Sequence, residues 1–187
     1  MIIQKEAYPM KLSKSILLFS LLAITTSVFS DDFISANGVK LSVGDSLKTV
    51  TNKLGKPVEK VDELIIWKLK NGNRVVARFD QYGLSNATLS GKVTTDYLNT
   101  NGTRIFLNKE SINSIEKKLK YGCYHEGWGE GAIADYVVRS GPEGSINLIF
   151  NTWGGEITTK QLKSQKVSAL SLGDDEPFGE QKYCHYQ

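Results

Sequence analysis

Three short blocks of this sequence occur twice in the same order, and this pattern constrains the fold more than any other feature. The blocks and their copies are residues 37–41 and 101–105, residues 47–54 and 112–119, and residues 75–83 and 146–154. The offset between copies grows from 64 to 65 to 71 residues along the chain. A duplication followed by loop insertions produces such growth. We therefore predict two tandem units, the first at residues 31–97 and the second at residues 98–162.

The amino terminus has the composition of a secretory signal. Lys11 and Lys14 precede an almost wholly apolar run at residues 16–24, and small residues come before a cleavage point near Ser30. A transmembrane anchor is the alternative, but the run is shorter than the roughly 20 residues that span hydrocarbon. We expect residues 1–30 to be removed as a signal peptide. The mature chain is then periplasmic or secreted, with no stable membrane insertion.

The composition argues against a protein that binds nucleic acid by charge. Loss of residues 1–30 takes three basic residues and one acidic residue from totals of 23 and 20, which leaves a net charge of about +1. An electrostatic nucleic-acid binder needs a concentrated basic stripe. The densest basic cluster, residues 117–120, is typical of the solvated face of a helix. We therefore expect a protein partner and no nucleic acid.

The chain has two cysteines, Cys123 and Cys184. An even count in an exported protein favours a disulfide, which would tie the carboxyl-terminal tail, residues 163–187, to the second unit. Closing a loop of this length stabilises a fold by roughly 4 kcal/mol in the chain-entropy model. The alternative is a metal site that also uses His125 and His185, but the adjacent Cys184 and His185 do not easily point at one ion. We predict the disulfide, no metal and no cofactor.

Each unit begins with a helical pattern. The apolar residues of 47–54 recur at positions i, i+3 and i+7 and share one helix face, and those of 112–119 do the same. Gly55 and Gly122 end the two patterns. Helices this short are marginal alone, so their apolar stripes must pack on another element.

Strand patterns follow each helix. Residues 65–69 and 75–79 alternate between apolar and polar side chains, and Asn71-Gly72 between them is a strong hairpin signal. A third strand is expected near residues 87–93, and the second unit repeats this layout. The predicted fold class is therefore α+β, with two tandem units. In each, short helices pack on one face of a three- to four-stranded antiparallel sheet. Beyond residue 160 the pattern weakens, and residues 161–171 fit either a helix or a strand.

The sequence contains no recognisable catalytic set. His125 beside Glu126, with Glu130 nearby, is the nearest approach to one and would support a small hydrolase as an alternative. No serine or cysteine nucleophile lies in a recognisable elbow. The glycine-rich stretch 127–131 precedes a strand and lacks the lysine of a phosphate cradle. We predict no catalytic residues and a chain that is not an enzyme.

Two surfaces are candidates for binding a partner, namely the outward face of the sheet and the glycine-rich loop. Aromatic and arginine side chains on a mixed polar surface are typical of protein interfaces. The alternative is that these rings cover the edge of the core. The candidate partner-binding residues are Arg78, Asp80, Tyr82, Tyr124, Trp128, Ile149, Asn151 and Trp153.

Several motifs carry a resemblance. Residues 43–46 (VGDS), residues 54–57 (LGKP), a strand with tryptophan and residues 75–83 (VVARFDQYG) resemble the periplasmic α/β module of the SmpA/OmlA outer-membrane assembly lipoproteins. The same module, doubled, resembles the β-lactamase-inhibitor-protein fold. The resemblance covers residues 37 to about 160 and implies helices on a four-stranded sheet that binds partner proteins. The lipid-bearing cysteine and the inhibitors' cysteine pairs are absent here.

These features together predict an exported, soluble protein-binding module. A sharper version is an inhibitor or immunity protein that acts on an envelope or secreted enzyme. One alternative is a structural envelope component related to the outer-membrane assembly lipoproteins, and the other is the small hydrolase.

Overall fold

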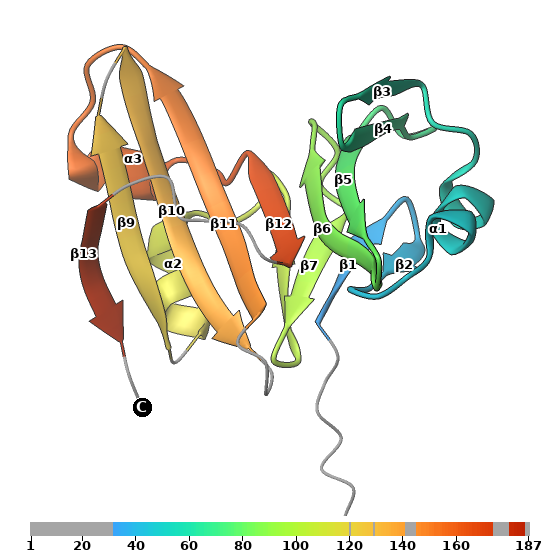
Figure 1. The fold of residues 1–187 in the computed structure, drawn as a ribbon. Coiled ribbons are helices and arrows are strands. Elements are labelled where there is room, and N and C mark those ends of the chain that lie inside the picture. The colour runs from blue at the N-terminus through green and yellow to red at the C-terminus, as the bar shows by residue number, and fades with distance from the viewer. Residues whose placement is uncertain (1–31, 120, 129, 141–144, 174–179, 186–187) are drawn as a thin grey trace, which may run out of the picture.

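The computed structural model describes residues 32–119, 121–128, 130–140, 145–173 and 180–185 of the 187-residue chain. The described residues form short helices and two antiparallel sheets (Figure 1), which confirms the predicted α+β class. The predicted signal peptide, residues 1–30, lies outside the described residues. The helices are α1 (Leu47–Leu54), α2 (Ile112–Lys118) and α3 (Thr159–Ser164). The strands are β1 (Phe33–Ala36), β2 (Val39–Leu41), β3 (Glu59–Val61), β4 (Leu64–Lys68), β5 (Arg74–Asp80), β6 (Gly83–Ser90), β7 (Tyr97–Thr100), β8 (Thr103–Phe106), β9 (Gly122–Trp128), β10 (Gly131–Ser140), β11 (Ser145–Gly154), β12 (Ala169–Gly173) and β13 (Glu180–His185).

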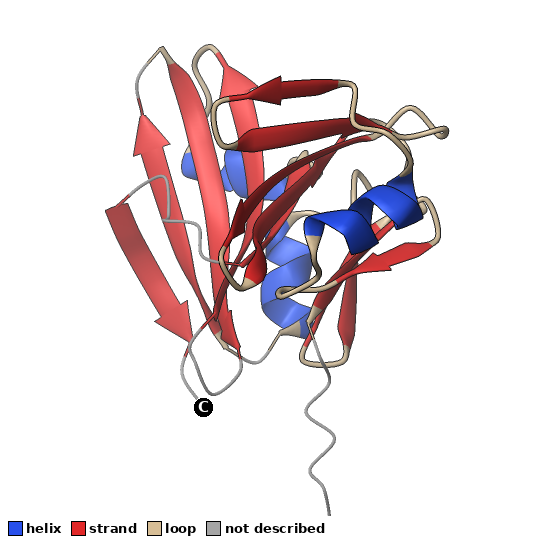
Figure 2. Cartoon of the chain, turned by 45° about the vertical axis from the view of Figure 1, so that its right-hand side comes forward, coloured by secondary structure: helices blue, strands red, loops and turns tan. Residues whose placement is uncertain are grey.

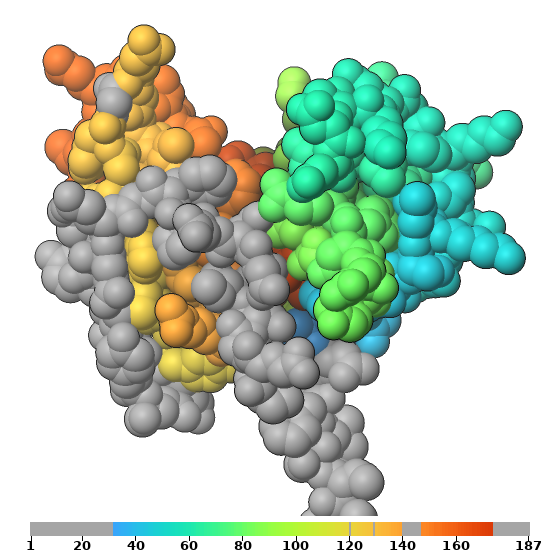
Figure 3. Space-filling model, viewed as in Figure 1, coloured from blue at the N-terminus to red at the C-terminus, as the bar shows by residue number. Residues whose placement is uncertain are grey.

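The small sheet has four strands in the order β2-β1-β7-β8, and the large sheet has nine in the order β13-β9-β10-β11-β12-β6-β5-β4-β3. We call β3–β6 the first wing of the large sheet, and β9–β12, with β13 at the outer edge, the second wing. The wings appear as two masses side by side in Figure 3. Because β12 pairs with both β11 and β6, the wings form one continuous sheet.

The central position of β12 differs from the sequence-based expectation. We predicted a separate small sheet for each unit and a tail held mainly by its cysteine. Instead, residues 159–164 form α3 and residues 169–173 form a strand that is buried along its whole length. The pattern of residues 161–171 was ambiguous because this segment contains both a helix end and a strand. Thr158 caps α3 through a capping box with Gln161, which explains why the helix begins there.

The hydrophobic core lies on one face of the large sheet. One row of directly paired, buried residues crosses both wings, and it consists of Tyr124, Tyr136, Ile149, Leu170, Leu89, Val75 and Trp67. The small sheet and the helices cover this face (Figure 2) and add Ile34, Leu98, Val50, Ile115 and Leu162 to the same core. Each such side chain contributes on the order of 1.5–3 kcal/mol through the hydrophobic effect.

The two hairpins of the small sheet make reciprocal contacts. β1 pairs with β7 so that Ile34 lies opposite Leu98. Asn37 and Asn101, in the two hairpin turns, both have positive φ, as a two-residue turn requires. Asp96, before β7, accepts a hydrogen bond from the backbone of Asn37, while Asp32, before β1, accepts one from the backbone of Asn101.

The same two carboxylates also hold one asparagine each from the large sheet. Asp96 accepts from Asn73 Nδ2 at 2.7 Å, beside the start of β5, and Asp32 accepts from Asn147 Nδ2 in β11. Asp96 also accepts from Asn71 Nδ2 at 2.9 Å. Each aspartate therefore precedes one hairpin and accepts a hydrogen bond from the turn of the other. The same aspartate joins the small sheet to the large sheet through an asparagine.

The third repeated block does not keep its orientation. Phe79 packs against the core and meets Trp67 edge-on, with ring centroids 6.4 Å apart. Phe150 instead pairs with Asp135 and Ala169, on the opposite face from Ile149. The matched residues therefore lie in dissimilar environments, and our residue-by-residue alignment of 75–83 with 146–154 is wrong. A strand alternates faces with every residue, so an error of one position reverses each side chain.

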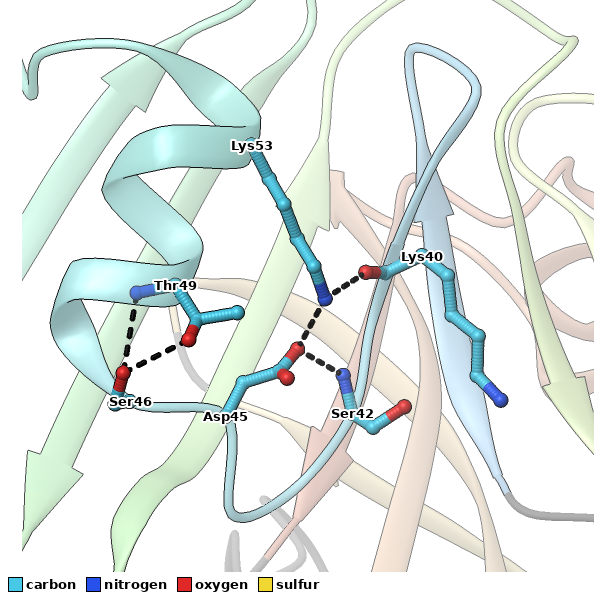
Figure 4. A network of polar contacts seen from close by, with 6 residues as sticks. All are labelled: Lys40, Ser42, Asp45, Ser46, Thr49 and Lys53. Atoms are coloured by element: carbon cyan, nitrogen blue, oxygen red, sulfur yellow. Dashed lines mark hydrogen bonds and ion pairs between the residues drawn. The ribbon is translucent and has the colours of Figure 1, made fainter.

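A polar network ties α1 to β2 of the small sheet and to the loop between them (Figure 4). Asp45 accepts from the backbone of Ser42 and from Lys53 Nζ, which also donates to the carbonyl of Lys40. Ser46 caps the helix by accepting from the backbone of Thr49. These bonds secure the loop before α1 to the helix itself.

Candidate binding site

A pocket of about 420 Å³ lies at the ends of three strands of the second wing. We call it the tryptophan pocket, and its lining residues are Gly127, Trp128, Glu130, Gly131, Ala132, Ile133, Thr152, Trp153 and Gly154. These residues come from the end of β9, the start of β10 and the end of β11, which meet at the upper left of Figure 1. The pocket therefore lies on regular strands that are paired with one another.

The two tryptophans are placed by strand register. Ala132 pairs with Trp128 on one side and with Trp153 on the other, so the three residues share one sheet face with the alanine between the indoles. The indoles are 53% and 44% exposed, whereas Ala132 is buried. Adjacent strands lie about 4.8 Å apart, so the two tryptophan backbones stand roughly two strand spacings apart.

Glycines around the tryptophans let the strands approach closely. A Cβ atom at Gly131 would lie 2.6 Å from the carbonyl oxygen of Trp153, so a larger residue there would push β10 from β11. Gly127 and Gly154 also line the pocket and carry no side chain to fill it. The glycine-rich stretch predicted as a binding loop is thus partly the paired ends of two strands.

The chemistry of the pocket suits recognition of a side chain. Two indoles and Ile133 offer apolar and π surfaces, and each indole also has one N–H donor. Glu130 is exposed and supplies a carboxylate at the same place. An aliphatic or aromatic group fits such a lining, as does a basic side chain that stacks on an indole with its charge toward Glu130. Among the described residues that line it, none is a serine, cysteine or histidine.

The candidates of the first wing lie elsewhere. Tyr82 is 80% exposed at the turn between β5 and β6, and its backbone donates to Asp80. Arg78 is exposed and its Nε lies 3.8 Å from Glu63. The three residues Arg78, Asp80 and Tyr82 are on the surface as predicted, but on the other wing from the tryptophans. The structure therefore does not bring the two halves of the predicted surface together.

Three candidates are not on a surface at all. Tyr124 and Ile149 are fully buried and Asn151 is nearly so, so none can bind a partner in this structure. The register places Ile149 beside Tyr136 and Leu170 in the core row. We expected Ile149 and Asn151, both on β11, to lie on the outward face of the sheet, and that orientation is wrong. The alternation misled us because β11 has apolar residues on both faces.

Tyr124 is held in the core by polar partners. Its hydroxyl donates to Glu126 at 2.9 Å, and Lys163 Nζ lies 4.6 Å from the ring centre. Burial, followed by the hydrogen bond to Glu126, raises the pKa of Tyr124 well above its ordinary value. The neighbouring Tyr136 is also buried, and desolvation raises its pKa to about 12.

The residues of the hydrolase alternative are dispersed. His125 is buried and faces Asp135, with Nδ1 and Oδ1 4.0 Å apart. Glu126 accepts from Tyr124 instead, and Glu130 lies in the tryptophan pocket. Sequence reasoning missed Asp135 as the neighbour of His125. The β9–β10 hairpin register, which pairs them directly, was the signal that could have found it.

The predicted disulfide is compatible with the backbone register. β13 pairs with β9 so that Cys184 lies opposite Cys123. Cys123 is disulfide-bonded, while the side chain of Cys184 is outside the described residues. Across the part of the chain that the structure describes, no group of three or more histidine, cysteine, aspartate or glutamate side chains is placed to hold a metal ion.

Comparison with known proteins identifies no family. No family model matches the chain, and no curated protein matches it. Among solved structures, the fold is similar to an extracellular protein containing an SCP domain from Bacillus anthracis str. Ames, with 12% identity and a TM-score of 0.41. The match covers 73% of this chain and 48% of that one, so this chain spans about half that protein's length. A likeness this distant carries no argument about function.

Among the described helices, none has the length and apolar character to cross a bilayer.

Proposed function

We propose that this chain is an exported binding protein and that its tryptophan pocket receives a side chain of a partner protein. The observation that carries the proposal is the pair of half-exposed indoles, Trp128 and Trp153, on either side of Ala132 at the end of the second wing. Export is supported by the signal-like sequence of residues 1–30.

The physical case rests on exposure and rigidity. A large indole half in water exposes apolar surface that gains free energy when a partner covers it. Tryptophan is among the residue types most enriched at the few interface positions that dominate affinity. Both indoles stand on paired strands, so little conformational entropy is lost when they bind.

The finer proposal is an inhibitor or immunity protein built from two related units. Its partner is an envelope or secreted enzyme, and its role is binding rather than catalysis. The first two repeated sequence blocks and the reciprocal hairpin contacts support the related units. The resemblance of residues 37 to about 160 to inhibitor-like modules supports the class of partner.

The test is affinity capture with matched variants. Full-length protein is used as bait in envelope and culture-supernatant fractions, beside Trp128→Ala, Trp153→Ala and Tyr82→Ala. Tyr82 is the matched control because it is an exposed aromatic residue on the other wing. We expect one partner to be retained by the wild type and by Tyr82→Ala, and each tryptophan variant to bind it about 30-fold more weakly, as for a truncated hot-spot residue.

The control measurement is thermal unfolding of each variant, because an exposed side chain should be removable without loss of the fold. Equal capture by wild type and both tryptophan variants would contradict the proposal. So would loss of the partner with Tyr82→Ala alone, since that result would place the interface on the first wing.

A further inference from the structure

A second surface with unusual composition lies on the small sheet. Its solvent-facing side carries three aromatic rings and three cationic side chains. We call it the basic-aromatic face, and its residues are Phe33, Tyr97, Phe106, Lys40, Arg104 and Lys109. None of these residues belongs to the tryptophan pocket.

The rings form a row across the sheet. Phe33 and Tyr97 meet edge-on with centroids 6.0 Å apart, and Tyr97 and Phe106 are tilted with centroids 5.2 Å apart. All three are half-buried. Their strand neighbours Ile34 and Leu98 point the other way and are fully buried in the core. Because side chains alternate along a strand, the rings lie on the side away from the large sheet.

Each ring has a cation above it. Lys40 Nζ is 4.6 Å from the Phe33 centroid, Arg104 Cζ is 5.0 Å from that of Tyr97, and Lys109 Nζ is 4.9 Å from that of Phe106. Such contacts are within the range of cation–π attraction. Figure 4 shows the Lys40 side chain pointing away from the Asp45–Lys53 network, which uses only its carbonyl. The rings thus hold the cations in place on the outer side of the sheet.

The positive charge on this face is concentrated at one edge. Arg104 and Lys109 are exposed, and neither forms an ion pair with a carboxylate of the described residues. Lys166 Nζ donates to the carbonyl of Lys109, which adds a third cation beside β8. The nearest acids in sequence are both buried and already have partners. Glu110 pairs with Lys118, and Asp96 accepts three hydrogen bonds. The edge is therefore basic although the mature chain is nearly neutral.

We infer that the basic-aromatic face binds a carboxylate-rich surface of a protein partner, with Arg104 and Lys109 as its principal contacts. Charge complementarity favours an anion, and a guanidinium matches a carboxylate through two parallel hydrogen bonds. The ring faces are covered by their own cations and the rings meet at steep angles, so they are not an open platform for stacking bases. This geometry favours an acidic protein over single-stranded nucleic acid. The site shares no residue with the tryptophan pocket, so this proposal does not depend on the proposed function.

The experiment measures binding of a fluorescein-labelled polyglutamate peptide to the full chain by fluorescence anisotropy at low salt. The test variant is the double substitution Arg104→Glu with Lys109→Glu. The matched control is Lys60→Glu with Lys117→Glu, which makes the same change of charge at exposed lysines on β3 and α2. We expect the test variant to bind about tenfold or more weakly, since charge at a binding surface governs encounter, and the control to stay near the wild type.

Four further results decide the inference. Arg104→Lys keeps the charge without the planar fork, so we expect a smaller loss than in the double variant. Equal weakening by test and control variants would mean that net charge alone governs binding, and would overturn the proposal. Absence of measurable peptide binding would overturn it too, as would tighter binding of a single-stranded oligodeoxythymidylate through the same residues. Thermal unfolding checks that each variant is folded.

Discussion

The two wings of the large sheet differ in the face that lies away from the core. In the first wing this face of β5 is open to solvent, with Arg74, Arg78 and Asp80 exposed and Val76 half-buried. In the second wing the middle of the corresponding face is covered. His125, Asp135, Val137, Leu148 and Ser171 are all buried there, although Arg139 and Thr152 on the same face are exposed. β5 therefore has one solvated face, whereas the middle of the second wing is buried on both faces.

The difference teaches when strand alternation can be trusted. A strand with one solvated face shows a clean apolar and polar alternation, and a strand buried on both faces does not. The inward face of β5 was accordingly predicted correctly and that of β11 was reversed. The difference between the wings also affects stability. Truncation of an outer-face side chain should be tolerated in the first wing and should destabilise the second.

The largest expected contrast comes from outer-face truncations. Leu148→Ala should lower the free energy of unfolding by about 3 kcal/mol, because it leaves a cavity at a fully buried site. Val76→Ala, on the half-buried outer face of the first wing, should lower it by about 0.5 kcal/mol or less. Urea denaturation followed by circular dichroism measures both. Equal losses would show that the middle of the second wing is not covered on this face.

A smaller effect is expected at the two carboxylates that fasten the hairpins. Asp96→Ala should cost about 2 kcal/mol, because it removes an acceptor from the buried amide of Asn73 and from the half-buried amide of Asn71. Asp32→Ala should cost less, about 1 kcal/mol, because Asp32 is only half-buried. The same denaturation assay applies, with Lys60→Ala as a surface control. A larger loss at Asp32 than at Asp96 would contradict the assignment.

The paired core tyrosines of the second wing should respond in opposite directions. Among the described residues Tyr136 Oη has no hydrogen-bond partner, so Tyr136→Phe should be neutral or stabilise the fold by up to about 1 kcal/mol. Tyr124→Phe removes the bond to Glu126 and should cost about 1 kcal/mol. Thermal unfolding of both variants makes the comparison. Destabilisation by both, to the same degree, would mean that the Tyr136 hydroxyl is satisfied.

Alkaline pH should destabilise the fold through the buried Tyr136 of the second wing. Burial raises the pKa of Tyr136 to about 12, whereas an exposed tyrosine ionises near 10. Between these values the unfolded chain loses this proton and the folded chain keeps it. The contribution is therefore fully present below pH 10 and declines as pH rises toward 12. The matching row position in the first wing is Trp67, which does not ionise.

The measurement is urea denaturation across this pH range, for the wild type and Tyr136→Phe. The variant should show the shallower decline. Identical pH profiles would contradict the raised pKa of the folded state.

The sequence predicted two of the helices and several strands of the large sheet, but neither the small sheet nor the joining of the wings. Helices at 47–54 and 112–118 and the turn at Asn71-Gly72 follow from apolar spacing and turn chemistry, and the structure contains them. β12 was ambiguous because all five of its residues are buried, so they show no alternation of apolar and polar side chains that would indicate a strand. Pairing with β6 across roughly 80 residues of sequence is not encoded in any local pattern.

For the candidate site, the sequence singled out Trp128 and Trp153 but not their common pocket. Each is a conspicuous aromatic residue beside glycine, whereas their placement about Ala132 depends on two strand registers. The basic-aromatic face was missed for the same reason. Its residues come from four strands and a turn, and no stretch of sequence shows them together.

The most direct test of this account is native-state amide hydrogen exchange of β12, residues 169–173. If the wings form one sheet through this strand, its amides should exchange as slowly as those of β5 and β10 and should open only with global unfolding. Fast exchange in β12, with β5 and β10 still protected, would show that the wings are separate sheets and would contradict the account.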